Sequence, residues 1–281
     1  MLFNFLPLIL TPLIVSASRK LVYYKADPAV TGKSITHGVK FMAFDVLSSY
    51  SDKSIPQVKG VALDSNQEVI GAIKTLSRDD AARVMWTVND MDVDTAGTEF
   101  LDTLVAQMQK TAPLSFFGIN IACETNIQTC GSTFRRVQTV PTLLNTNTEW
   151  WVTILIANNQ LSDAQAAFLR QVGVTTPAIG VPRTINFRFL FVISEHPSRL
   201  IEIVERAAKT FRAFLDGNGL QDMKVSLTLN MDQFANYNGF IQRLADAMTA
   251  LKEVDYFAFT REFLNESEML KSIDTFKEFD D

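Results

Sequence analysis

The sequence has little of the chemistry that metal sites and nucleic-acid binding require. Its 281 residues include only two histidines, and His37 and His196 lack the spacing of metal ligands. It has no basic run, and a formal net charge of -5 argues against a nucleic-acid partner. It also lacks a Gly-x-Ser-x-Gly elbow and a phosphate-binding glycine loop. We therefore expect neither a metal nor a cofactor.

The first 17 residues contain no charged side chain. This stretch is apolar, but it is short and interrupted by proline, so it suits a membrane span poorly. Val15 and Ala17 are small residues of the kind that a signal peptidase reads, and charge begins at Arg19. We predict a cleaved signal peptide over residues 1–17 and a secreted domain over residues 18–281 that is not held at a membrane. An uncleaved anchor is the alternative.

The two cysteines lie seven residues apart. In an oxidising compartment a local disulfide between Cys123 and Cys130 is expected, and two unpaired cysteines are the alternative. Asn265 begins the one N-glycosylation sequon, so a surface glycan is expected at that position.

Short apolar runs rich in β-formers alternate with amphipathic segments along the whole chain. This alternation predicts parallel strands with crossover helices. Eight strands are expected, which is the number that closes a single-domain (βα)8 TIM barrel. The expected strands cover residues 21–24, 39–44, 83–88, 116–123, 151–156, 185–193, 223–229 and 254–259.

Local signals mark several of the expected helices. Ser162 and Gln165 form a capping box, and Pro197 suits the first turn of a long amphipathic helix. The segment from Gly131 to Glu149 fits less well, because it is longer than a normal connection. There we expect a loop over the barrel mouth and a short or missing fourth helix.

Active sites of such barrels lie at the C-terminal ends of the strands. Polar residues follow most of the expected strands, and most of them suit a solvated rim. Glu124, directly after the fourth strand, is the best catalytic candidate on position alone.

The fourth strand also resembles a known motif. The sequence resembles glycoside hydrolase family 18, the chitinases and chitinase-like proteins, whose fourth strand reads D-G-x-D-x-D-x-E. The aligned residues are Phe117, Gly118, Asn120, Ala122 and Glu124. Weaker similarities are the aromatic run 21–24, Thr36-His37 before the second strand, and Ala43-Phe44 within it.

The resemblance implies a role for each residue at this strand end. In the family the glutamate protonates the leaving glycosidic oxygen, and the aspartate two residues before it supports the substrate acetamido group. Ala122 replaces that aspartate and cannot form a hydrogen bond with its side chain. We therefore expect Glu124 to retain little or no chitinase activity.

Candidate ligand contacts are polar residues near the strand ends and residues with aromatic faces. The family's tryptophan on the eighth strand is missing, so Tyr256 is the aromatic substitute, whereas a core role is the alternative for Trp86. The full set is Asn120, Asn89, Asp90, Tyr24, Trp86, Asn158 and Tyr256.

Three functions remain open at this point. The first is a secreted, inactive chitinase-like protein that binds chitin or an N-acetylglucosamine oligosaccharide, or else an extracellular protein. The second is an active glycosidase in which Asp45 or Asp90 supports Glu124. The third is a secreted TIM barrel with no carbohydrate role.

Overall fold

The computed structural model describes much of the chain in fourteen separate stretches. These are residues 20–24, 26, 41–48, 52, 54–76, 83–89, 99–107, 116–123, 127–137, 149–157, 160–174, 184–190, 196–230 and 240–260. The predicted signal peptide and Asn265 lie outside them, so both remain predictions. No helix in these stretches is long and apolar enough to cross a membrane.

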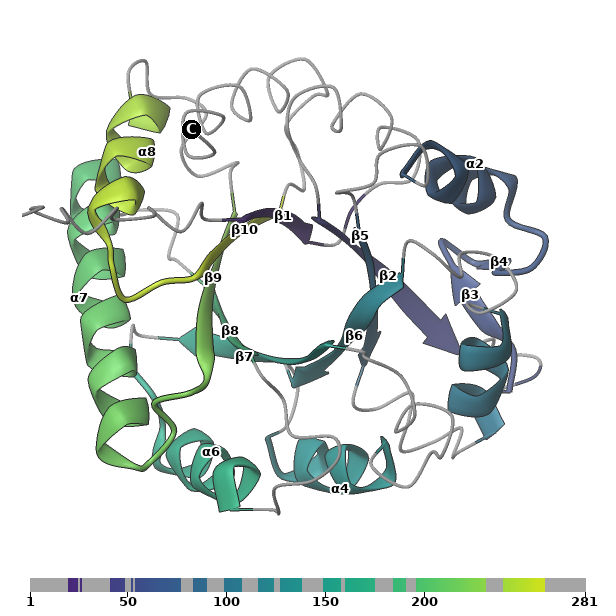
Figure 1. The fold of residues 1–281 in the computed structure, drawn as a ribbon, viewed down its shortest axis with the longest axis horizontal. Coiled ribbons are helices and arrows are strands. Elements are labelled where there is room, and N and C mark those ends of the chain that lie inside the picture. The colour runs from purple at the N-terminus through teal and green to yellow at the C-terminus, as the bar shows by residue number, and fades with distance from the viewer. Residues whose placement is uncertain are drawn as a thin grey trace, which may run out of the picture.

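The fold is a mixed α/β structure around one mostly parallel sheet. Eight strands form successive parallel pairs, and β1 pairs with both β10 and β2, which closes a ring (Figure 1). Each of the eight overlaps an expected strand. They are β1 (Lys20–Tyr24), β2 (Phe41–Ser48), β5 (Arg83–Asn89), β6 (Phe116–Cys123), β7 (Glu149–Ala157), β8 (Thr184–Leu190), β9 (Lys224–Asn230) and β10 (Tyr256–Thr260).

Two short strands were not expected from the sequence. β3 (Pro56–Val58) and β4 (Val61–Ala62) form an antiparallel hairpin that extends the sheet beside the end of β2. Lys59 and Gly60 connect them with φ values of 52° and 75°. Positive φ at both central residues is the requirement of a type I′ hairpin turn, which Gly60 meets without strain.

Helices lie outside the ring of strands (Figure 1). Residues 99–107 are also helical. The capping box before α6 is confirmed, because Gln165 N donates to Ser162 Oγ and Ser162 N donates to Gln165 Oε1. The helices with defined bounds are α2 (Gln67–Leu76), α4 (Ile127–Val137), α6 (Asp163–Val174), α7 (Pro197–Gly217) and α8 (Phe240–Ala250).

The expectation of a short or missing fourth helix was wrong. α4 begins at Ile127, so Gly131 lies inside a helix rather than at the start of a loop. The helix was missed because it begins at Ile127, so a segment taken from Gly131 onward contains only part of its amphipathic pattern. Residues 138–148 lie outside the described stretches, so a loop over the mouth remains a prediction.

The main hydrophobic core lies between the outer face of the strand ring and the helices. On β8, Ile185, Phe187 and Phe189 are buried in it, and the Phe187 ring stacks on Phe211 of α7 with 4.2 Å between centroids. The amphipathic face expected for α7 is confirmed, because one set of its apolar residues is buried in this core: Leu200, Ile201, Val204, Ala207, Ala208, Phe211 and Leu215. This outer core fixes the strands whose inner faces carry the candidate site.

Candidate functional site

Period-two alternation directs every second side chain of a strand into the interior of the ring, which we call the lumen. Phe187 and Phe189 pack in the outer core, so Asn186 and Arg188 on the same strand face the lumen. The same reasoning places Ala122 of β6 in the lumen, because Ile121 and Cys123 both pack outside. The lumen is therefore lined by a different set of residues from the outer core.

A continuous chain of hydrogen bonds crosses five neighbouring strands inside the lumen. Thr228 Oγ1 donates to Asn186 Oδ1 at 2.8 Å, and Asn186 Nδ2 donates to Thr153 Oγ1 at 3.0 Å. Thr153 Oγ1 donates to Asn120 Oδ1 at 2.8 Å, and Asn120 Nδ2 donates to Thr87 Oγ1 at 3.3 Å. All five residues are buried. We call this set the lumen chain.

Every bond of the lumen chain is donated in the same direction, from β9 toward β5. Each amide uses its oxygen on one side and its nitrogen on the other, and Thr153 donates once and accepts once. Such a head-to-tail arrangement polarises successive hydrogen bonds cooperatively. It leaves Thr228 with unused acceptor capacity at one end and Thr87 with its own hydroxyl hydrogen at the other.

The lower part of the lumen, toward the N-terminal strand ends, is apolar. Trp151 and Tyr256 pack there with 4.8 Å between ring centroids. The Tyr256 hydroxyl also accepts a hydrogen bond from Lys224 Nζ at 3.1 Å. Trp151 and Tyr256 belong to a second hydrophobic cluster, smaller than the outer core, which consists of Val22, Ala43, Met85, Trp151, Tyr256 and Ala258.

Above the lumen chain, strand register places four side chains at one height. Strands tilt in a barrel, so residues level with one another on alternate strands are offset from the hydrogen-bonding register. Moving two strands around the ring and two residues toward the C-terminal end leads from Asp45 to Ala122. Repeating this move leads to Arg188 and then to Thr260. When the β1–β10 register is continued by one residue, the same move from Thr260 returns to Asp45. We call these four residues the mouth layer.

The mouth layer places one carboxylate and one guanidinium on opposite strands of the ring. β2 and β8 are four strands apart, so Asp45 and Arg188 face one another across the axis, and both are half-buried. Ala122 and Thr260 occupy the two strands between them with small side chains. Asn89 and Asn230 form the next level, as the last residues of β5 and β9.

Thr260 is a deeply buried polar residue of this layer. Its side chain is 2% exposed, and its Oγ1 has no hydrogen-bond partner among the described residues. A buried hydroxyl without a partner costs about 1–3 kcal/mol. Native structures rarely carry such a group without a reason.

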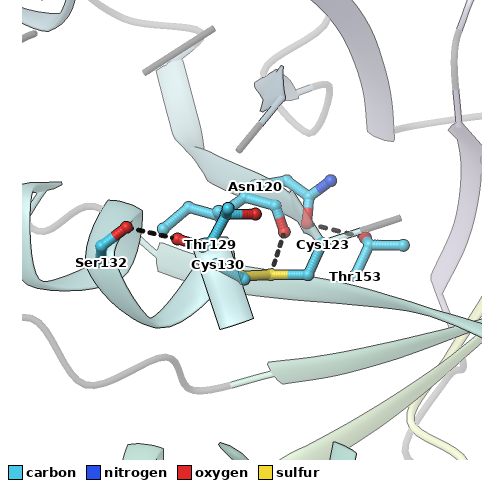
Figure 2. Close-up of a disulfide and its surroundings, with 7 residues drawn as sticks. Asn120, Cys123, Thr129, Cys130, Ser132 and Thr153 are labelled. Atoms are coloured by element: carbon cyan, nitrogen blue, oxygen red, sulfur yellow. Dashed lines mark hydrogen bonds between the residues drawn. A yellow bond between two sulfur atoms is a disulfide. The ribbon is translucent and has the colours of Figure 1, made fainter. Parts of the chain in front are cut away.

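The predicted disulfide between Cys123 and Cys130 is present. It joins the last residue of β6 to the first turns of α4, with 5.4 Å between the two Cα atoms (Figure 2). Both cysteines are buried in the outer core, whereas Asn120 on the same strand bonds Thr153 in the lumen (Figure 2). The disulfide thus closes the segment that contains Glu124, the residue directly after β6.

The structure separates the predicted ligand residues into distinct places. Asn120 lies below the mouth layer, within the lumen chain, and Asn89 lies at the end of β5. Trp86 is fully buried in the outer core beside Phe44, which favours the core role over sugar stacking. Tyr256 is buried at the start of β10, far along its strand from the mouth.

Several predicted site residues, or their side chains, lie outside the part of the chain that the structure describes. Glu124, Asp90 and Asn158 fall between the described stretches, and the side chain of Tyr24 is not described although its backbone belongs to β1. Their roles therefore remain predictions from the sequence.

Arg188 and Thr260 were not predicted as site residues from the sequence. Arg188 had a detectable signal, because Phe187-Arg188-Phe189 places one charge within an apolar alternation. The structure also reveals a regular spacing in the lumen chain: the three hydrogen bonds that connect Thr87, Asn120, Thr153 and Asn186 each join residues 33 positions apart.

Comparisons with known proteins identify the fold alone. No protein-family model and no curated protein matches the sequence. A GH18 chitinase from Pseudoalteromonas aurantia matches with a TM-score of 0.62 at 11% identity, over 93% of this chain and 100% of that chain. The endo-beta-1,4-mannanase from Thermotoga petrophila matches with a TM-score of 0.60 at 11% identity, over 94% and 77% of the two chains.

A protein with a different activity is also similar. The homocysteine methyltransferase MmuM from Escherichia coli matches with a TM-score of 0.51 at 12% identity, over 96% of this chain and 99% of that chain. The fold resembles those of glycosidase TIM-barrel enzymes, but it does not by itself specify a reaction.

Proposed function

We propose that this chain forms a (βα)8 barrel of the chitinase-like type that binds carbohydrate at its mouth and has lost hydrolytic activity. The observation that carries the proposal is the composition of the mouth layer: Asp45 faces Arg188, and Ala122 stands where the family motif has a carboxylate. The similarity in fold to a chitinase and a mannanase supports a carbohydrate-related role.

The polar side chains of the mouth suit the hydroxyl groups of a sugar. Carboxylate, guanidinium and amide groups are planar, and each presents two or more acceptors or donors at fixed spacing. Asp45 and Arg188 supply such groups within the mouth layer, and Asn89 and Asn230 supply them at the next level. A neutral saccharide, which both donates and accepts, matches this mixed set better than a ligand of one charge sign.

Loss of hydrolysis follows from Ala122. Substrate-assisted hydrolysis needs a group that supports the acetamido oxygen while the neighbouring acid protonates the leaving oxygen. A methyl group supplies neither a hydrogen bond nor charge stabilisation for the transition state. We infer that Glu124, left without this neighbour, does not drive turnover.

Secretion is part of the same proposal. A disulfide formed by the only two cysteines supports an oxidising compartment. Cleavage after residue 17 and a glycan on Asn265 would follow from that location. Mass spectrometry of protein secreted from a eukaryotic host tests both, because each changes the mass of the mature chain.

The decisive experiment measures binding and hydrolysis on one sample. The wild type is titrated with N-acetylglucosamine and mannose oligomers by calorimetry, and products are followed by chromatography. We expect saturable binding without product. Arg188→Ala should weaken binding by about tenfold, as loss of a charged hydrogen bond predicts. Absence of binding to every oligomer contradicts the proposal and favours a protein partner.

An active glycosidase is the second candidate, because Asp45 places a carboxylate at the same height as Ala122. Turnover that is abolished by both Glu124→Gln and Asp45→Asn would establish this alternative. Turnover abolished by Glu124→Gln alone would show activity without the help of Asp45.

A further inference from the structure

Beyond the mouth layer, the end of β2 and the β3–β4 hairpin form a small sheet that leaves the ring. β2 runs outward past the circle of strands, and β3 pairs with its last residues (Figure 1). These residues follow Asp45 in β2, so the hairpin lies on the mouth side of the barrel. We call residues 47–48, 56–58 and 61–62 the shelf.

Strand register gives the shelf two different faces. Residues directly opposite one another in an antiparallel pair share a face. Leu47 is opposite Gln57, and Gln57 is opposite Ala62, so these three form one face, which we call the open face. Val58 points the other way and is buried in the outer core. The open face therefore continues the inner face of β2 upward from Asp45, while the opposite face is anchored on the core.

The open face carries an exposed apolar side chain. Leu47 is 48% exposed, and Gln57 and Ala62 beside it are half-buried. Leu47 and Val61 are the two large apolar side chains that stand exposed in the part of the chain that the structure describes, and both belong to the shelf. A ligand that covers Leu47 gains free energy, because it removes apolar surface from water.

Hydrogen bonds fix the shelf and obstruct its free edge. Asn66 Oδ1 accepts from Val69 N at 3.1 Å at the start of α2, and Asn66 Nδ2 donates to Val58 O at 2.9 Å. Ser65 N donates to Ala62 O at 3.1 Å, so the turn after β4 already uses this carbonyl. An open edge recruits another strand through such groups. The shelf therefore offers its open face rather than its edge, and in a fixed shape.

We propose that the open face of the shelf binds the outer units of an oligosaccharide whose first ring contacts the mouth layer. The inference rests on the proposed carbohydrate function and specifies the direction in which that ligand extends. Leu47 follows Asp45 by two residues on one face of β2, about 6.6 Å farther along at roughly 3.3 Å per residue. A saccharide ring has apolar C–H groups on its faces and hydroxyl groups at its rim, which match Leu47 and the amide of Gln57.

The size of the open face favours a saccharide over a protein partner. Its three side chains are few compared with a stable protein interface, which takes roughly 20–30 residues from each side. One or two sugar rings need no more than such a strip. Continuity with Asp45 through β2 also places the strip where an oligomer bound at the mouth leaves the ring.

The length of the oligomer tests the shelf. Dimers and hexamers of N-acetylglucosamine and of mannose are titrated against the wild type by calorimetry, and the ratio of hexamer to dimer affinity is measured. We expect the hexamer to bind more tightly. Leu47→Ser should lower this ratio about fivefold, as the loss of contact with a partly exposed leucine predicts. Leu47→Met keeps an apolar side chain of similar volume and should preserve the ratio.

Val61→Ser is the matched control. Val61 is 46% exposed, nearly as much as Leu47, but it lies opposite Val58 on the face that the core anchors. It loses a similar kind of apolar surface without touching a ligand on the open face, so the affinity ratio should stay at the wild-type value. Gln57→Leu keeps a side chain of similar size and removes the amide, so it should lower the ratio.

The outcomes separate the shelf from the proposed function. A ratio that Leu47→Ser leaves unchanged, or that Val61→Ser lowers equally, overturns the shelf and leaves the carbohydrate function standing. Equal affinity of the wild type for dimer and hexamer has the same meaning. If the wild type binds no oligomer, the carbohydrate function fails and the shelf fails with it. A fall in the ratio confined to Leu47→Ser and Gln57→Leu supports the shelf.

Discussion

The outer and inner faces of the strand ring are built on different principles, although alternate residues of the same strands form both. The outer face is a continuous apolar core against the helices, in which Phe187 and Phe211 stack. The upper inner face is a set of hydroxyls and amides joined by directional hydrogen bonds. Bulky branched residues usually fill the lumen of TIM barrels, so the polar upper part of this lumen departs from that pattern.

This difference indicates that the outer face contributes most of the free energy of unfolding, whereas the inner face fixes the geometry of the interior. Apolar contacts are tolerant of shape-conserving exchange, whereas a hydrogen-bonded network fails when one member stops matching its neighbours. The outer face should therefore respond to lost volume, and the inner face should respond to lost partners. Neighbouring residues Asn186 and Phe187 provide a test within one strand.

The largest effect is expected from truncation of the outer core. Phe187→Ala removes a fully buried ring that stacks on Phe211. We expect the free energy of unfolding to fall by about 3–5 kcal/mol, the usual cost of such a cavity. Urea denaturation followed by circular dichroism measures it. A loss below about 1 kcal/mol would contradict the view that the outer face contributes most of the free energy of unfolding.

Leucine substitutions of similar volume compare the inner and outer faces more directly. Asn186→Leu fills a similar volume but leaves Thr153 and Thr228 without their shared partner, so we expect a loss of about 2–3 kcal/mol. The outer-face counterpart Phe187→Leu should cost less, about 1–1.5 kcal/mol. The same denaturation experiment compares them. If the leucine at 186 proves harmless, the inner face behaves as an ordinary apolar core.

The disulfide gives an intermediate effect on the outer side. Cys123→Ser with Cys130→Ser opens a loop closed across seven residues, which should cost about 2 kcal/mol through entropy of the unfolded chain. The lumen chain should survive, because Asn120 faces the opposite side of β6. Melting temperatures of the oxidised wild type and the double variant measure the loss, and an equal melting temperature would show that the crosslink contributes nothing.

Much of the ring could be predicted from sequence because its signals are local and repeated. Each of the eight strands of the ring coincides with an apolar run rich in β-formers, and the capping box of Ser162 and Gln165 marks the start of α6. The β3–β4 hairpin escaped detection because its strands are only three and two residues long. Its one clear signal was Lys59-Gly60 at the turn.

The lumen could not be predicted, for a physical reason. The runs Asn186-Phe187-Arg188-Phe189 and Ser226-Leu227-Thr228-Leu229 alternate polar and apolar residues. The same alternation describes a strand with one face in water, so periodicity cannot distinguish solvent from a closed interior. Only ring closure shows that Asn186 and Thr228 are buried. The motif at β6 indicated where to look, but not that Asn120 belongs to a chain spanning five strands.

The smallest effect is expected at the end of the lumen chain, where it tests the chain as a connected unit. Thr228→Val removes only the first donor, so Asn186 Oδ1 loses one bond and we expect a loss of about 1 kcal/mol. Thr153→Val, in the middle, breaks two bonds and should cost about twice as much. Thr228→Ser keeps the donor and should lie within about 0.5 kcal/mol of the wild type. Chemical denaturation measures both losses. Equal losses for Thr228→Val and Thr153→Val would contradict the two hydrogen bonds assigned to Thr153, whereas the expected ratio supports an end position for Thr228 and a middle position for Thr153.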